Sequence, residues 1–201
     1  CDIGYYPSLF GVDVRISHAD LQPVDSLSKD LYGILGVSIY SEGKESIEEV
    51  IVQLGKEKNK TISTAESCTG GLIGHRLTEI PGSSDVYKGG LVVYSNESKI
   101  EMVGVGKGTL EGHGAVSAET AESMAYNVKN KFVSDYGISV TGIAGPTGGT
   151  KEKPVGLVYI GLAKNDGVKV KEFRFGNNRK RNKLRSSQVA LNWLRLSLLN
   201  D

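Results

Sequence analysis

The stretch Thr61–Gly71, with the sequence T-I-S-T-A-E-S-C-T-G-G, constrains the fold more than any other part of the chain. Small and β-branched residues in its first half are typical of a buried strand. Gly70 and Gly71 allow a sharp turn, and apolar residues at helical spacing follow them. The pattern therefore predicts a strand that turns directly into a helix. Ser67 lies at the corner, where unpaired N–H groups favour negative charge, so it is a candidate nucleophile or a plain helix cap.

The composition allows a buried hydrophobic core, and the chain has little net charge. Hydrophobic residues make up 39% of the 201 residues, and the formal net charge is +1. The only dense basic run, Arg179–Arg185, is weak support for nucleic-acid binding, so nucleic acid is not an expected partner. No apolar segment reaches the ~20 residues that span a bilayer, and no secretory signal opens the sequence. We expect no membrane association and a cytoplasmic location.

Cysteine and histidine are too sparse to suggest a disulfide framework or a metal site. Cys1 and Cys68 are the two cysteines, and the three histidines are scattered without the spacing of metal ligands. We therefore expect neither a metal nor another cofactor.

Residues 1–42 differ from the rest of the chain in their pattern of apolar residues. Val12–Ile16 alternates like a half-buried strand, apolar residues between 24 and 35 recur at helical spacing, and Val37–Tyr40 has the pattern of a second strand. We interpret this small β-α-β piece as the end of a small α/β domain that would precede the sequence, or as an extension packed on the main domain. The main domain is expected over residues 43–201.

The main domain alternates predicted helices and strands. Ser46, Asn96 and Ser117 are suited to cap the helices that follow them, because their side chains can accept a backbone N–H. Strands are predicted over 90–95, 136–141, 155–163 and 168–175, the last two joined by a tight turn, and a final helix is predicted over 184–198. The predicted fold class is α/β, with a mixed, mostly parallel sheet covered by helices.

Polar residues gather at the ends of the predicted strands. Ser67 is followed by Thr69, Gly70 and Gly71; Tyr94 is followed by Lys99; and Thr141 is followed by the glycine loop 142–149. Ligands of open α/β sheets bind outside the carboxyl ends of the strands. If the three strands are neighbours, all of these residues line one crevice.

A base that could activate Ser67 is found by elimination. The glycine loops match neither the P-loop nor the G-x-G-x-x-G pattern. His75 would point away from Ser67 on the following helix, and the neighbouring Cys68 has no histidine in evident reach. Lys99 is the remaining candidate for the base, provided that burial or a nearby cation lowers its pKa well below the ordinary value of about 10.4. The alternative is a solvated surface lysine.

Several short motifs, taken together, resemble a known family. They are Ala65–Gly71, Pro81–Ser84, Tyr94–Asn96 followed by Lys99, Gly114–Ser117, and Thr141–Thr150 with Lys153–Gly156. In this order they are similar to the C-terminal domain of the CinA (competence/damage-inducible protein A) family, which is a nicotinamide-nucleotide amidase. The resemblance covers about residues 43–201. The sequence from Ile3–Pro7 onward resembles the end of the small middle domain in full-length CinA proteins.

The resemblance implies a reaction and three catalytic residues. The reaction is hydrolysis of the carboxamide of nicotinamide mononucleotide to nicotinic acid mononucleotide and ammonia. By matching position, Ser67 is the nucleophile, Lys99 is its base, and Tyr94 belongs to the same site. A small-molecule substrate, a pyridine mononucleotide, is thus expected, and a homodimer or larger assembly is expected as well.

Physical reasoning adds substrate-binding groups to these three residues. N–H groups at Thr69, Gly70 and Gly71 are expected to hold a tetrahedral oxyanion, which needs preorganised donors. The ribose phosphate is expected to meet Arg179 and the glycine loop. The loop residues assigned to substrate binding are Thr141, Gly142, Ala144, Gly145, Gly148 and Gly149. Which basic residue of Arg179–Arg185 takes the family position stays open.

Two other functions stay open at this point. The chain could be a regulatory module that binds the nucleotide without turning it over, because full-length CinA proteins carry a further N-terminal domain with pyrophosphatase activity. The Arg179–Arg185 run could instead contact nucleic acid, in which case binding would weaken steeply with salt.

Overall fold

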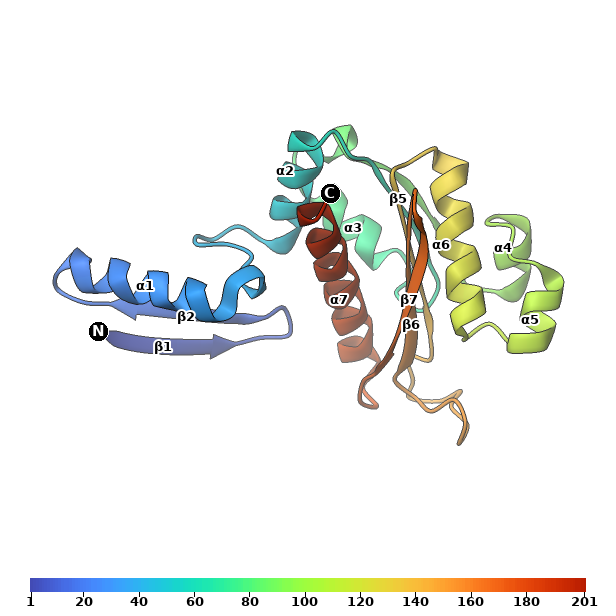
Figure 1. Cartoon of the computed structure of the whole chain (residues 1–201). Coiled ribbons are helices and arrows are strands. Elements are labelled where there is room, and N and C mark those ends of the chain that lie inside the picture. Colours follow the sequence, from blue (N-terminus) through green and yellow to red (C-terminus); the bar gives the residue numbers. More distant parts are fainter.

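The computed structural model describes residues 1–201. It consists of a small N-terminal unit and a larger domain built on a five-stranded sheet, and Figure 1 shows the N-terminal unit standing to one side of that domain. No helix in the structure combines the length and the apolar character needed to cross a membrane.

The N-terminal unit is a two-stranded antiparallel sheet with one helix. β1 (Asp2–Pro7) pairs with β2 (Val12–Ser17), and α1 (Leu21–Leu35) and the short 3₁₀ helix η1 (Gly36–Ser38) follow. The order is therefore β-β-α, and the prediction of a β-α-β piece with a strand at 37–40 is wrong. The reason lies in long-range contacts: the Val37 carbonyl accepts a hydrogen bond from Arg195 at 2.6 Å, and Tyr40 packs against the core of the larger domain.

The larger domain contains a mixed sheet with the strand order β4-β3-β5-β6-β7. Its strands are β3 (Ile62–Glu66), β4 (Tyr87–Val92), β5 (Tyr136–Gly142), β6 (Leu157–Lys164) and β7 (Gly167–Arg174). β3 runs parallel to both β4 and β5, whereas β6 is antiparallel to β5 and to β7. The predicted mixed α/β sheet with a late hairpin is confirmed. The strand predicted at 90–95 begins and ends three residues earlier.

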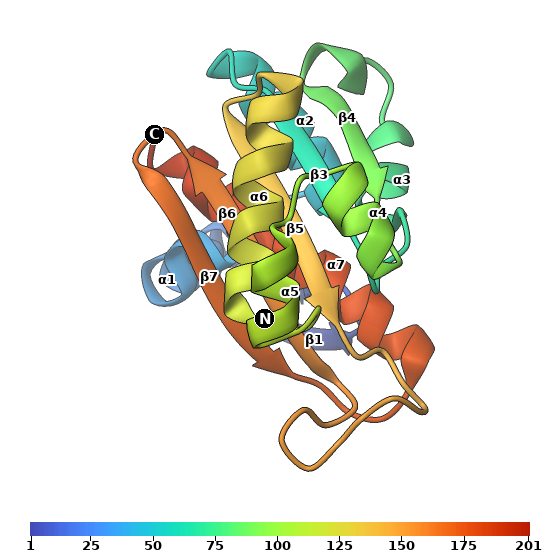
Figure 2. The ribbon, with the colours of Figure 1, turned by 90° about the vertical axis from the view of Figure 1, so that its right-hand side faces the viewer.

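Helices cover both faces of this sheet (Figures 1 and 2). One face carries α2 (Ile47–Glu57), α3 (Leu72–Thr78) and α7 (Arg179–Leu199); the other carries α6 (Ala118–Phe132), with α4 (Asn96–Glu101) and α5 (Lys107–His113) beside it. A short 3₁₀ helix, η2 (Ser83–Asp85), precedes β4. The larger core cluster lies on the α7 side and includes Ile51, Ile138 and Leu194. A smaller cluster on the α6 side includes Ala65 and Met124.

Side-chain caps fix where several helices begin. Ser46 caps α2 in a reciprocal capping box with Glu49, and the Ser117 hydroxyl accepts the Thr120 N–H at the start of α6, as predicted. The prediction that Asn96 caps the next helix is wrong, because Ser95 caps α4 and Ser98 reaches back to the Ser95 N–H. The helix carrying Lys99 therefore begins directly after Tyr94 and the cap.

Candidate active site

Ser67 directly follows the central strand β3. Its N–H donates to the Val140 carbonyl of β5 at 2.9 Å, which extends the sheet pairing to Ser67 itself. Because β3 lies between β4 and β5 and is parallel to both, the carboxyl ends of all three strands meet at one edge of the sheet. Ser67, the Tyr94–Lys99 corner and Thr141 are brought to this edge. The predicted juxtaposition of the three strand ends is present.

The turn after Ser67 requires its two glycines. Gly70 and Gly71 have φ angles of +63° and +89°, a left-handed conformation that side chains disfavour. The Gly70 N–H donates to the Ser67 carbonyl at 3.0 Å and closes the turn before α3 begins. The predicted strand-turn-helix is confirmed.

Lys99 reaches Ser67 from the neighbouring strand-to-helix corner. Its Nζ lies 3.1 Å from Ser67 Oγ, and the lysine is 1% exposed. The same nitrogen lies 3.0 Å from the Val93 carbonyl oxygen and 3.3 Å from that of Tyr94. A neutral amine has two N–H donors and one lone pair. The carbonyl oxygen of Ser95 also lies 3.5 Å from this nitrogen. In the neutral amine, two of these carbonyls can take the N–H donors, and the lone pair can then accept the Ser67 hydroxyl proton.

The electrostatic surroundings favour the neutral form of Lys99. Burial lowers its pKa from the ordinary lysine value, and the charges of Cys68 and Glu97 act in the opposite direction. Burial also raises the pKa of Cys68 to about 12, so its thiol is uncharged at neutral pH and does not oppose the effect on Lys99 there. A thiol with this pKa is a poor nucleophile, which disfavours Cys68 as the rival to Ser67.

Backbone N–H groups in the turn after Ser67 are free to receive developing negative charge. Those of Thr69 and Gly71 have no hydrogen-bond partner within the chain, whereas the Gly70 N–H is used in the turn. The expected set of three oxyanion donors is thereby reduced to two. The Thr69 hydroxyl is also buried without a partner, which is costly for a polar group unless a ligand or water supplies the missing bond.

Glu66 is a buried carboxylate that the sequence reasoning did not single out. It is 2% exposed and accepts the N–H groups of Ile73 at 3.1 Å and Gly74 at 2.8 Å. These are orphan donors of the first turn of α3, so Glu66, the residue before Ser67, caps this helix. The position of Ser67 is thereby tied to both β3 and α3.

Tyr94 meets Lys99 through its backbone and Arg179 through its side chain. The Tyr94 hydroxyl is the acceptor for Arg179 Nη2 at 2.9 Å, and the tyrosine is 60% exposed. Arg179 Nη1 donates to the Gly145 carbonyl at 3.0 Å. Arg179 therefore joins the β4 strand end to the glycine loop. Its role, and that of Tyr94, toward a substrate stays a prediction.

The glycine loop is held mainly by packing. The Thr141 hydroxyl donates to the Ala115 carbonyl at 2.6 Å, and a side chain on Gly142 or Gly149 would collide with backbone atoms of β6 or the segment before it. Gly145 and Gly148 have φ angles of +85° and +87°. The Ala144 carbonyl accepts from Asn182 at 3.0 Å, which anchors the loop to α7. Packing alone thus explains these glycines, and their contact with a substrate stays a prediction.

Lys183 also lies near this site, and it is one of the basic residues of Arg179–Arg185 among which the sequence left the assignment open. It lies one helical turn after Arg179 on α7, and its Nζ is 3.4 Å from the place where a Cβ on Gly70 would stand. The i, i+4 spacing from Arg179 was the available signal, because residues four apart share one face of a helix.

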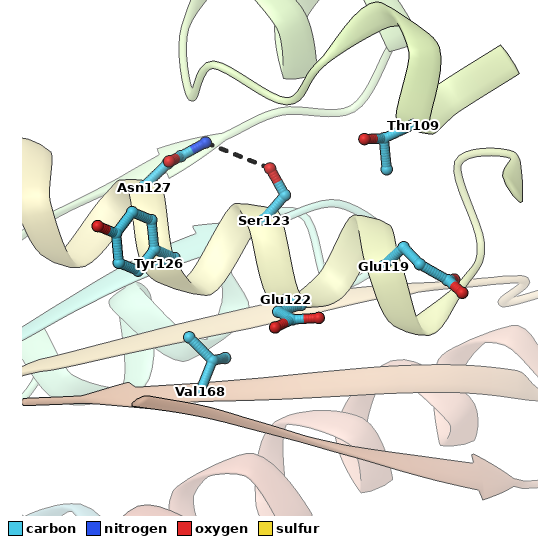
Figure 3. Close-up of a pocket in the computed structure, with 7 residues that line it drawn as sticks. All are labelled: Thr109, Glu119, Glu122, Ser123, Tyr126, Asn127 and Val168. Carbon is cyan, nitrogen blue, oxygen red and sulfur yellow. Dashed lines mark hydrogen bonds between the residues drawn. The ribbon is translucent and has the colours of Figure 1, made fainter. Parts of the chain in front are cut away.

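A separate hollow of about 360 Å³ lies between α5, α6 and β7 (Figure 3). Its lining residues are Thr109, Glu119, Glu122, Ser123, Tyr126, Asn127 and Val168. Two carboxylates in this hollow would repel an anionic nucleotide, and it contains no nucleophile-base pair. His75 is equally remote from the chemistry, because it is exposed and pairs with Glu79 at 3.9 Å. No group of three or more metal-ligating side chains is arranged to hold a metal.

The fold and the site define a class: mixed α/β proteins with a serine-lysine pair at the carboxyl edge of the sheet. Comparison with known proteins identifies the family. The model of the CinA C-terminal domain matches residues 44–198, and the chain belongs to this family.

Relatives and solved structures agree with this assignment. A relative from Caldicellulosiruptor bescii, named among the competence-damage inducible proteins, is 45% identical over 97% of the chain and 49% of its own length. A CinA-like protein from Kosmotoga olearia is 47% identical over 86% of the chain and 42% of its own length. The chain thus spans about half the length of the curated relatives it matches.

The crystal structure of the competence/damage inducible protein CihA from Agrobacterium tumefaciens superposes with a TM-score of 0.73. It is 42% identical and matches 76% of this chain and 93% of its own. A CinA superfamily protein from Klebsiella pneumoniae has a TM-score of 0.72 at 25% identity, with 78% of this chain and all of its own covered.

Proposed function

We propose that this chain is a serine amidohydrolase that deamidates nicotinamide mononucleotide to nicotinic acid mononucleotide and ammonia. The observation that carries the proposal is the contact between Ser67 Oγ and the buried Lys99 Nζ at 3.1 Å. A serine hydroxyl needs an adjacent base to become a nucleophile, and an amine whose pKa is lowered by burial can serve. The choice of substrate rests on the family resemblance.

The first half of the reaction transfers the acyl group to Ser67. Its oxygen attacks the carboxamide carbon while its proton passes to Lys99 Nζ, and the carbonyl oxygen becomes an oxyanion. We assign that charge to the N–H groups of Thr69 and Gly71, and the support for this assignment is that both are free of other hydrogen bonds. Lys99 then gives the proton to the leaving nitrogen, and the C–N bond breaks. Ammonia leaves, and the acyl group remains on Ser67 as an ester.

Water completes the cycle. Lys99, neutral again, takes a proton from a water molecule that attacks the ester carbonyl, and the collapse of this second intermediate returns the proton to Ser67 Oγ. The products are a carboxylate on the pyridine ring and the free serine. We further propose that residues 43–201 form the catalytic domain, that the protein works in the cytoplasm, and that it assembles as a homodimer or larger homo-oligomer.

The first prediction concerns Ser67→Ala. This change removes the attacking oxygen, so ammonia release from nicotinamide mononucleotide should fall by roughly 10³-fold or more. Because only one hydroxyl is lost, the free energy of unfolding should change by no more than about 1 kcal/mol. An ammonia assay and a denaturant titration measure the two effects, with Ser123→Ala on α6 as the matched serine control. Full activity in Ser67→Ala would refute the mechanism.

The same assay separates the enzyme from a sensing module. A sensor would be stabilised by nicotinamide mononucleotide, with a rise in the melting temperature, and would release no ammonia. An enzyme should show both effects in the wild-type chain. The Ser67→Ala variant should keep the stabilisation and lose the ammonia.

A further inference from the structure

Lys183 differs from every other basic residue in the Arg179–Arg185 run. Arg179 is bonded to Gly145 and Tyr94, and the Arg185 guanidinium lies over the Phe175 ring at 5.1 Å. Lys180 and Arg181 are exposed. Lys183 is half-buried, and its Nζ lies against Gly70 in the turn that follows the nucleophile.

The Lys183 ammonium has no counter-charge within the chain. It takes part in no ion pair and no hydrogen bond in the structure. Glu66, the buried carboxylate next to Ser67, is already engaged by the N–H groups of Ile73 and Gly74. A partly desolvated cation without a partner is costly, so such a group is expected where a ligand brings negative charge.

Other unpartnered polar groups surround the same turn. The N–H groups of Thr69 and Gly71 are free, and the Thr69 hydroxyl is fully buried without a partner. The two N–H groups are assigned above to the oxyanion of the reaction, which leaves the Thr69 hydroxyl and the Lys183 ammonium with bonds still to make around the same stretch, Thr69–Gly71. This concentration of unsatisfied donors at the mouth of the Ser67 site indicates that an anionic ligand completes it.

We propose that Lys183 is the residue by which the site selects substrates that carry a phosphate. The ammonium would bind the phosphate dianion of the mononucleotide while its carboxamide lies at Ser67. Arg179, whose two terminal nitrogens are already bonded, would mainly hold Tyr94 and the glycine loop in place. This inference rests on the proposed function and extends it from the reaction to the specificity of the site.

The test compares Lys183→Met with Lys180→Met on two substrates, nicotinamide mononucleotide and the corresponding nucleoside, which lacks the phosphate. Loss of a charge-assisted hydrogen bond should raise KM for the mononucleotide about tenfold or more, with kcat changed by less than about threefold. The nucleoside kinetics should not change. Lys183→Arg, which keeps the charge, should restore most of the affinity, and Lys180→Met should behave as wild type.

Two outcomes would overturn the proposal. One is an unchanged KM for the mononucleotide in Lys183→Met. The other is an equal loss on both substrates through kcat, which would place Lys183 at the reacting centre and not at the phosphate. Melting temperatures of all variants, measured alongside, separate these results from a folding defect.

A second readout does not depend on turnover. Inorganic phosphate should raise the melting temperature of the wild-type chain and of Lys180→Met, and it should do so at about tenfold higher concentration, or not at all, in Lys183→Met. If the wild-type chain releases no ammonia, the proposed function fails, and this titration still decides the role of Lys183. Equal phosphate binding in wild type and Lys183→Met would refute that role.

Discussion

The N-terminal unit and the five-stranded domain differ most in how far their side chains are buried from water. In the N-terminal unit, α1 has no buried residue, and Tyr5 and Val12 remain 63% and 58% exposed. The larger domain buries complete apolar clusters and also buries charged residues, among them Lys99, Glu66 and Arg76, each hydrogen-bonded to a neighbour. The difference shows where chemistry can be placed. Burial away from water is what lowers the pKa of Lys99, and the larger domain provides it.

Polar contacts join the two regions, and they come from α3, the helix that follows the Ser67 turn, and from α7. The Arg76 guanidinium of α3 lies over the Phe10 ring of the N-terminal unit at 5.1 Å, and Gln188 of α7 donates to the Phe10 carbonyl at 2.6 Å. Arg76 also pairs with Glu48 and donates to Ser187 and Gln188. This network attaches the exposed region to the buried one, together with the Arg195 bond to Val37 and the packing of Tyr40.

The largest effect is expected when the buried region loses its base. Lys99→Met should lower kcat/KM for ammonia release by about 10²–10⁴-fold, the range for loss of a general base. The free energy of unfolding should fall by no more than about 2 kcal/mol, because the loss of the bonds to the Val93 and Tyr94 carbonyls is offset by the removal of a group that is costly to bury. Steady-state kinetics and denaturant titrations measure the two. Near-wild-type kinetics in Lys99→Met would mean that another group activates Ser67.

The pH dependence of the rate and of the stability also tests whether Lys99 is the base. Because burial lowers the pKa of Lys99, the amine is protonated and inactive below that pKa and becomes a base above it. The rate should therefore rise with pH through the lowered pKa. The unfolded chain binds its proton up to about pH 10.4, so Lys99 should also make stability increase with pH between the two pKa values. Lys99→Met should lose this stability dependence.

An intermediate effect is expected at the junction. Arg76 and Glu48 are 8% and 9% exposed, so Arg76→Met would leave the Glu48 carboxylate buried and unpaired. Breaking a buried pair in this way costs roughly 3–5 kcal/mol of unfolding free energy. Chemical denaturation measures the loss. Removing both partners, in Arg76→Met with Glu48→Met, should recover much of it, and failure to recover would show that contacts other than the pair dominate.

The sequence was sufficient for the parts of the site that depend on local structure. Ser67, Tyr94 and Lys99 each lie within a few residues of a strand end, and the apolar periodicity and turn residues locate those ends. Since parallel neighbouring strands end at the same edge, placing the three strands next to one another was enough to bring Ser67 and Lys99 together.

The remaining features depend on contacts between distant segments. Glu66 points to α3 and not to the substrate because N–H groups seven and eight residues later need an acceptor. Lys183 meets Gly70 only because α7 packs beside α3. Val37–Tyr40 has a strand-like pattern, but its carbonyl and aromatic groups find partners in the larger domain, so no strand forms. Local periodicity carries no information on such partners.

The smallest effect is expected within the N-terminal unit itself. Tyr5 of β1 is 63% exposed, so Tyr5→Ala should change the unfolding free energy of the larger domain by no more than about 0.5 kcal/mol. The rate of ammonia release should not change. The matched change in the buried region, Tyr136→Ala, removes a side chain that is 1% exposed and should cost about 3–5 kcal/mol. Thermal and denaturant unfolding of the two variants measure the contrast. A comparable loss in Tyr5→Ala would mean that the two regions unfold as one cooperative structure, and the distinction between an exposed unit and a buried domain would then fail.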